Sequence, residues 1–237
     1  MDHGFTVGGI RVELVKRAVK TLHLTVHPPE GRVRIVAPER MPLDAIRSFT
    51  ASKLPWIRRH VAELQAQERE SRCEYVDQES HLLWGSRYLM KVEERDAPPA
   101  VELRLRELVL FIRPGTDRRR REEILWAWYR AQVHAAVAPL LARWQPILKV
   151  KARAVSVRRM KTKWGSCNPG KGTIRLNADL ARKPPECLEY VLVHELAHFI
   201  VTGHDGSFKS LMSRHLPNWR QLRARLNHAP LAHEGWE

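Results

Sequence analysis

The 237-residue chain is long enough for one large domain or two small ones, and its 43% hydrophobic residues favour a folded protein over a disordered one. Lys and Arg number 41 against 26 Asp and Glu, so the formal net charge of +15 favours anionic partners or simply a solvated basic surface. Three cysteines without CxxC spacing argue against a disulfide framework or a zinc ribbon, and the longest apolar runs are too short to span a bilayer. We expect a cytoplasmic protein with no signal peptide and no membrane partner.

The first part of the chain is predicted to be rich in β-strands. Alternating apolar residues predict strands over Lys20–His27 and Arg32–Ala37, joined by a Pro-Pro-Glu-Gly turn. Apolar residues at helical spacing predict a helix over Leu43–Gln67, which Pro55 should break or kink. Strand patterns return over residues 88–93, 101–105 and 108–112.

The composition changes at Arg113–Thr116, and we place the boundary between a domain 1–115 and a domain 116–237 there. Thr116 or Asp117 can cap a long helix whose apolar face continues to Leu141. The pattern predicts an α+β protein in which a β-rich N-terminal part with one or two helices precedes a mainly helical part. No internal repeat is visible.

A short β section interrupts the helical part. Ala154–Met160 alternates and precedes KTKWGSCNPGKG, and Thr173–Asn177 would be the return strand. The WGSC segment is therefore expected to lie in a hairpin ahead of a helix over Pro185–Thr202, which Gly203 would end. Two shorter helices are expected over 207–216 and 217–227.

The segment from His194 to His198 reads HELAH and matches the H-E-x-x-H motif. Residues four apart lie on one face of a helix, so the two imidazoles can reach one Zn²⁺ ion at about 2 Å. Glu195 is then the candidate general base for an attacking water. Since the chain contains 12 histidines, the alternative is a chance match with satisfied core histidines.

A catalytic zinc needs a third protein ligand. No glutamate follows Glu195 before residue 234, and Asp205 is the only acid in that interval. His204 follows His198 by six residues, which is the third-ligand spacing of the metzincin pattern. We assign His204 as the third ligand, with Asp205 as the competing ligand or as a group that orients an imidazole.

Other polar residues carry weaker signals. The residues that flank WGSC could supply positive charge near the site or form a solvated strand face; they are Arg158, Arg159, Lys161 and Lys163. Ser166 and Cys167 lack an assigned base, so a turn-forming or packing role is favoured over nucleophilic catalysis. Packing or surface roles are also expected for Met212, His215, His228 and His233.

The chain resembles the YgjP-like family of zinc metallopeptidases, bacterial relatives of the SprT-like and WLM proteases, in KTKWGSCNPGKGTIRLNADL, PPECLEYVLVHELAHFIVTGH and SFKSLMSRHLPNWR. The resemblance continues in VKTLHLTVHPPEGRVRIVAPE and so covers nearly the whole chain. It implies a zincin-like catalytic part, Zn²⁺ at His194, His198 and His204, a catalytic Glu195, and a peptide or protein substrate.

Three functions are compatible with these observations, and a zinc metallopeptidase is favoured. The same site could instead hydrolyse nucleotides or phosphoesters, although such enzymes usually hold Mg²⁺ or paired metals with carboxylates, which are scarce here. A third possibility is a basic nucleic-acid-binding protein without catalysis, with a structural zinc or none. The phosphates would then contact Arg58, Arg59, Arg118–Arg121 and the basic cluster at 158–163. No recognised nucleic-acid-binding motif supports it.

Overall fold

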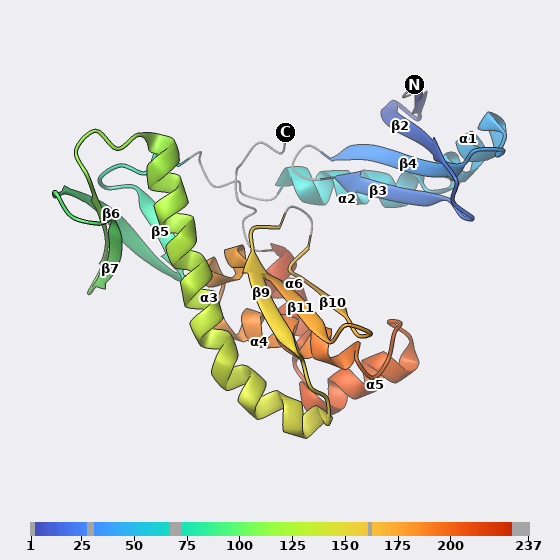
Figure 1. The fold of residues 1–237 in the computed structure, drawn as a ribbon. Helices are drawn as coiled ribbons and strands as arrows, with labels where there is room; N and C mark the ends of the chain where they lie inside the picture. The colour runs from blue at the N-terminus through green and yellow to red at the C-terminus, as the bar shows by residue number, and fades with distance from the viewer. Residues whose placement is uncertain (1–2, 28–30, 67–72, 161–162, 229–237) are drawn as a thin grey trace. The chain divides into compact units, whose positions relative to one another are not determined.

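The computed structural model describes residues 3–27, 31–66, 73–160 and 163–228 (Figure 1). These residues form two compact units, one up to residue 66 and one from residue 73. Each unit has its own hydrophobic core. The HELAH motif lies in the second unit, so the first matters here mainly for its topology.

The first unit is a four-stranded sheet with two helices. Its elements are β1 (His3–Val7), β2 (Ile10–Arg17), β3 (His23–His27), β4 (Arg32–Pro38), α1 (Leu43–Ser52) and α2 (Leu54–Ala66). The strand order is β1-β2-β4-β3, with β2 and β4 parallel and the other pairs antiparallel. The helix predicted over 43–67 is broken at Lys53, close to Pro55 as expected, because proline cannot donate a backbone hydrogen bond to a continuing helix.

The second unit begins with a sheet of the same design. It contains β5 (Ser80–Leu83), β6 (Ser86–Glu94), β7 (Ala100–Arg104) and β8 (Glu107–Ile112) in the order β5-β6-β8-β7. Its central pair is again parallel, its outer pairs are antiparallel, and a helix again follows. The chain therefore contains a structural repeat that its sequence does not reveal.

The first hairpin of each sheet closes through a two-residue turn. Gly8 and Gly9 have φ of 56° and 82°, and Trp84 and Gly85 have φ of 50° and 80°. Two successive positive φ values are typical of the type I′ turn, whose twist matches that of the strands it joins. Shared turn geometry and strand order thus mark the repeat more clearly than residue identity does.

The long helix α3 (Arg118–Leu148) starts at Asp117, one of the two expected caps, whose side chain accepts the Arg120 N–H at 2.7 Å. One side of α3 contacts β7 and β8, and it also contacts β9, α4 and the 3₁₀ helix η1 (Ala178–Arg182). The domain boundary expected at residues 115 and 116 therefore falls inside the second unit, because β5–β8 and the helices bury their apolar faces in one core.

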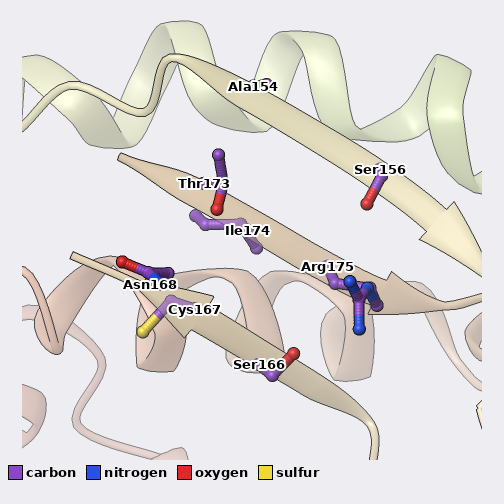
Figure 2. A pocket seen from close by; sticks show the side chains of 8 residues that line it. All are labelled: Ala154, Ser156, Ser166, Cys167, Asn168, Thr173, Ile174 and Arg175. Atoms are coloured by element: carbon purple, nitrogen blue, oxygen red, sulfur yellow. The ribbon is translucent and has the colours of Figure 1, made fainter. Parts of the chain in front are cut away.

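A three-stranded sheet made of β9 (Ala154–Arg158), β10 (Gly165–Asn168) and β11 (Thr173–Asn177) has the order β10-β11-β9. The expected return strand pairs antiparallel with β10 but parallel with β9, so the WGSC segment supplies a strand of its own at the sheet edge. A hollow of about 370 Å³ lies on this sheet, lined by residues of all three strands that include Ser156, Ser166 and Arg175 (Figure 2).

Helix α4 (Pro185–Ala197) lies against β10 and β11 and also contacts α3, α5 (Gly206–His215) and α6 (Trp219–His228) (Figure 1). Pro185 occupies its first turn as predicted, and most of its residues are buried. The α+β class is confirmed. Of the three sheets in the described residues, the second unit contains two, because β5–β8 belong to this unit and not to the first. None of the helices in the described ranges has the length and apolar character needed to cross a bilayer.

Candidate metal centre

The HELAH motif lies at the C-terminal end of α4. His194 and Glu195 belong to the last turn of the helix, and His198 is its C-cap with φ −67° and ψ −13°. This near-helical backbone keeps the two histidine side chains one turn apart on one face, as the spacing predicts. The position within the helix differs from the expectation, since the motif ends α4 instead of lying in its middle.

The chain leaves α4 through a tightened turn. The Phe199 N–H donates to the Leu196 carbonyl and the Ile200 N–H to the Ala197 carbonyl, both at 3.0 Å and both three residues back. The helix expected to continue to residue 202 therefore ends at Ala197. Gly203 does not have a positive φ and does not end the helix, so the predicted glycine stop is wrong.

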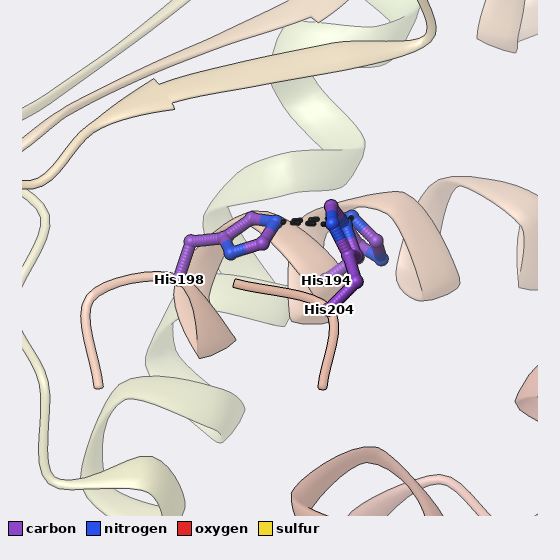
Figure 3. Close-up of side chains that lie close together, drawn as sticks. All are labelled: His194, His198 and His204. Carbon is purple, nitrogen blue, oxygen red and sulfur yellow. Dashed lines mark hydrogen bonds between the residues drawn. The ribbon is translucent and has the colours of Figure 1, made fainter. Parts of the chain in front are cut away.

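Three imidazoles converge beyond the end of α4 (Figure 3). The Nε2 atoms of His194 and His198 lie 3.2 Å apart, those of His198 and His204 3.2 Å, and those of His204 and His194 3.0 Å. The tertiary structure thus brings together the three histidines singled out as metal ligands. They form a group with the composition and spacing that could hold a metal ion.

The hydrogen bond on the far side of the His198 ring assigns its tautomer. His198 Nδ1 lies 3.1 Å from the Val201 carbonyl oxygen and donates to it, which leaves a lone pair on Nε2. That Nε2 atom can therefore donate a proton to neither neighbour. A cation that accepts a lone pair from each Nε2 atom would satisfy all three rings. Hydrogen bonds among the three Nε2 atoms could not, because His198 Nε2 has no proton to donate.

Phe208 of α5 packs against all three imidazoles. Its ring centroid lies 4.9 Å from that of His194, 4.7 Å from His198 and 4.8 Å from His204, and only 1% of Phe208 is exposed. Sequence reasoning did not single this residue out, because an apolar residue at the start of a short helix carries no site signal. The available hint was its place four residues after the candidate third ligand.

The environment favours the neutral form of His194 and His204. Burial, together with the charges of His198, His204 and Arg223, lowers the pKa of His194 to about 4. Burial, followed by the charges of His198 and Arg223, also lowers the pKa of His204. Neutral imidazole is the form that offers a lone pair to a metal ion.

Asp205, the competing ligand, performs a different task. Its side chain caps α5 by accepting the Phe208 N–H at 3.1 Å. It does not belong to the group of three histidines that could hold a metal ion. The cap nevertheless serves the site indirectly, because it fixes the start of the helix that carries Phe208.

Glu195 directly follows His194 and is a buried carboxylate, with only 6% of its surface exposed. Burial raises its pKa, while a hydrogen bond from Cys167 and the charges of His198 and Lys163 lower it. Strand β10 covers this carboxylate, since a Cβ atom built on Gly165 would lie 2.6 Å from Glu195 Oε1. The WGSC segment and the HELAH motif are therefore in direct contact, which spacing alone does not indicate.

The other basic residues considered for the site divide into two groups. Lys163 contributes charge near Glu195, whereas Arg159 donates to Glu122 at 2.6 Å and lies over the Trp126 ring at 4.3 Å. Among the residues for which a packing role was expected, Met212 is 1% exposed and belongs to the core. The expectations for Lys161 and His233 concern positions that lie outside the described residues.

Comparison with protein families identifies the chain. The family described as YgjP-like, metallopeptidase domain, matches residues 20–229. The chain belongs to the YgjP-like metallopeptidase family. Membership implies a divalent metal, usually zinc, and the histidine cluster is a possible place for it. No curated protein matches the chain.

Two solved structures resemble part of this YgjP-like protein, and both are metallopeptidase zymogens. Abylysin of Pyrococcus abyssi is 26% identical, covers 38% of this chain and 90% of its own, and has a TM-score of 0.36. Jannalysin of Methanocaldococcus jannaschii is 20% identical, covers 38% of this chain and 87% of its own, and has a TM-score of 0.35.

Proposed function

We propose that this YgjP-like protein is a zinc-dependent peptidase in which His194, His198 and His204 hold the ion and Glu195 is the general base. The convergence of three Nε2 atoms at mutual distances of 3.0 to 3.2 Å carries the proposal. Tetrahedral ligands at about 2.0–2.1 Å from zinc lie about 3.3 Å from one another, so the observed triangle is close to the required size.

The composition of the cluster supports the same assignment. Three imidazoles with no carboxylate form a donor set that suits zinc better than Mg²⁺ or Ca²⁺, which prefer oxygen ligands. Three protein ligands also leave one position of a tetrahedral site open, as a catalytic site requires. When bound, zinc would supply Lewis-acid polarisation of the scissile carbonyl.

The protein's own side chains supply the proton transfers and the orientation. Glu195 accepts a proton from the attacking water and returns it to the leaving amine. The Val201 carbonyl holds the His198 ring through Nδ1 at 3.1 Å, and the Phe208 ring packs against all three imidazoles. Each of these groups is held by backbone or core contacts, which favours a site formed before the substrate arrives.

Strand β10 offers a place for an extended substrate. It is the outer strand of the order β10-β11-β9, so within the described residues only one of its edges is paired. Its backbone can hydrogen-bond an added strand, and such pairing accepts many side chains. Because β10 also contacts Glu195, a peptide on this edge would pass close to the general base.

The rival functions receive less support. Among the described residues that follow Glu195, Asp205 is the only carboxylate, and it caps α5, so no carboxylate set for Mg²⁺ accompanies the histidines. Four of the arginines considered for phosphate binding, Arg118–Arg121, have partners within the chain. Arg118 and Arg121 donate to backbone carbonyls, and Arg119 and Arg120 lie 3.4 and 2.9 Å from Glu123.

Metal analysis combined with peptide hydrolysis tests the proposal. The wild type should contain one zinc per chain and cleave unstructured peptides, and Glu195→Gln should keep the zinc and lose turnover. His204→Ala should lose zinc, whereas the matched control His215→Ala, which removes a histidine of α5 outside the cluster, should keep both properties. Full peptidase activity in Glu195→Gln, or hydrolysis of nucleoside triphosphates instead of peptides, would contradict it.

A further inference from the structure

The backbone edge of β10 is the proposed substrate edge, but the side-chain positions of the WGSC segment have no role in the mechanism described so far, although Gly165 lies against the proposed general base. We propose that strand β10 positions Glu195, with Gly165 shaping the space for the carboxylate and Cys167 holding it through a hydrogen bond from the thiol. The inference rests on the proposed function and assigns Gly165 and Cys167 as positioning residues, not as groups that touch the substrate.

The alternation of β10 explains why these two residues act together. Gly165 pairs with Leu176 and Cys167 pairs with Ile174, and both partners are buried in the core of the second unit. Side chains two apart on a strand point to the same face, which here is the face toward α4. Ser166 pairs instead with the exposed Arg175, on the opposite face of the sheet (Figure 2).

Gly165 is required because no side chain fits between β10 and α4. A Cβ atom at this position would lie 2.6 Å from Glu195 Oε1, 2.8 Å from Val191 Cγ1 and 2.9 Å from Glu195 Cγ. Cβ atoms essentially never approach other heavy atoms within 3.0 Å, so a methyl group here must displace the Glu195 side chain. Since Glu195 is only 6% exposed, the side chain has little room to move without losing its position.

Cys167 supplies the directional contact. Its place two residues after Gly165 puts its side chain on the face toward α4, where the Glu195 carboxylate lies. Burial, followed by the Glu195 charge and a side-chain hydrogen bond to Glu195, raises the pKa of the thiol to about 12. The sulfur therefore keeps its proton near neutral pH and acts as a donor. One S–H group occupies one lone pair of the carboxylate, which leaves the remaining lone pairs free to accept a proton from water.

This arrangement couples the substrate edge to the base. The strand proposed to bind the peptide backbone also carries the two residues that orient Glu195, two positions apart. A displacement of β10 would therefore alter the position of the carboxylate as well as the binding edge. Contact with α4 thus explains why positions 165 and 167 carry small side chains, and the turn that follows them is not needed to explain it.

Steady-state kinetics of three variants test the assignment. Cys167→Ala removes the donor and should lower kcat about five- to fiftyfold with KM and zinc content unchanged, whereas Cys167→Ser, whose hydroxyl can donate, should recover most of the loss. Gly165→Ala should lower kcat at least as much while retaining zinc. Full kcat in Cys167→Ala, or equal losses in the Ala and Ser variants with unchanged melting temperatures, would overturn the role of Cys167.

A second measurement does not depend on peptidase activity. Iodoacetamide alkylation of Cys167, followed by mass spectrometry of zinc-loaded protein at a fixed pH near 8, should be several-fold faster in Glu195→Gln than in the wild type. Removing the carboxylate charge lowers the cost of forming the thiolate. Cys73 serves as the internal reference, because Glu195 is not among the groups that shift its pKa.

The two measurements separate this inference from the proposed function. An unchanged alkylation rate in Glu195→Gln would overturn the contact even if the protein is an active peptidase. A faster rate in a protein that cleaves no peptide would retain the contact between Cys167 and Glu195 while the proposed function fails.

Discussion

Phe208 of α5 stacks on His198 of the HELAH motif, with ring centroids 4.7 Å apart and planes inclined by 25°. The same phenylalanine meets His194 and His204 edge-on, at interplanar angles of 70° and 63°. One apolar side chain therefore limits the rotation of all three imidazoles. Rings that cannot rotate away lose less conformational entropy when they bind an ion.

Replacing Phe208 should weaken zinc binding without removing a ligand. We expect Phe208→Ala to lower the zinc affinity about 10- to 100-fold, the range typical when groups that orient metal ligands are removed. Competition with a chromophoric chelator measures the affinity. Phe199, a partly buried aromatic residue outside the ring contacts with the histidines, provides the control Phe199→Ala. Wild-type zinc affinity in a folded Phe208→Ala protein would show that the ring does not support the site.

The second unit should fold as a fragment only when β5–β8 are included. A fragment of residues 73–237 keeps the core that the sheet shares with α3, whereas a fragment of residues 116–237 exposes the apolar face of α3. We expect cooperative thermal unfolding, followed by circular dichroism, for the longer fragment alone. A sharp transition in the shorter fragment would instead support the domain boundary predicted at residue 116.

The Tyr129 hydroxyl links the two parts of this core. It donates to the Leu82 carbonyl of β5 at 2.9 Å, and Tyr129 is 1% exposed. Tyr129→Phe should lower the free energy of unfolding by about 1–2 kcal/mol, because it leaves a carbonyl group without its donor. Chemical denaturation measures the loss. Tyr88→Phe, at a partly buried position next to the same core, is the control, and equal effects in both variants would argue against a specific link.

Acid should destabilise the metal-free protein through His194. Its pKa is about 4 in the folded state, below its usual 6.5, chiefly because of burial and then because of the His198 and His204 charges. Between pH of about 6.5 and about 4 the unfolded chain therefore binds a proton at this residue that the folded chain does not, and stability falls as pH falls. The stability of His194→Gln, which cannot titrate, should decrease less over that interval. Parallel pH profiles of the metal-free proteins would contradict the assignment.

The alternation of apolar residues, the helix cap and the proline position predicted several strands and helix starts correctly. The strands at β3, β4, β6, β7 and β8, the cap at Asp117 and the start of α4 at Pro185 all match their predicted places to within a few residues. No strand was predicted at β1, β2 or β5, although Ile10, Val12 and Leu14 of β2 alternate with polar residues. The pairing of β9 was also wrong, because parallel pairing depends on a crossover and not on neighbouring residues.

The helix over the motif was predicted too long for a related reason. Apolar residues continue to Val201, so periodicity alone favours extension, but tertiary packing turns the chain after Ala197. The glycine at position 203 suggested a helix end that the backbone does not use. Propensity is a weak guide at such a position, since the competing turn is stabilised by the His198 hydrogen bond to the Val201 carbonyl.

The sequence by itself determined the candidate chemistry. In HELAH the two histidines are four residues apart, and a helix with 3.6 residues per turn places both imidazoles on one face, with the carboxylate next to them in sequence. It also narrowed the third partner to His204 or Asp205. Only the tertiary structure decided that the His204 ring lies next to the other two imidazoles, that Phe208 packs against all three, and that β10 contacts Glu195. Helical spacing is a property of local hydrogen bonds, whereas these contacts require separate segments to be packed together.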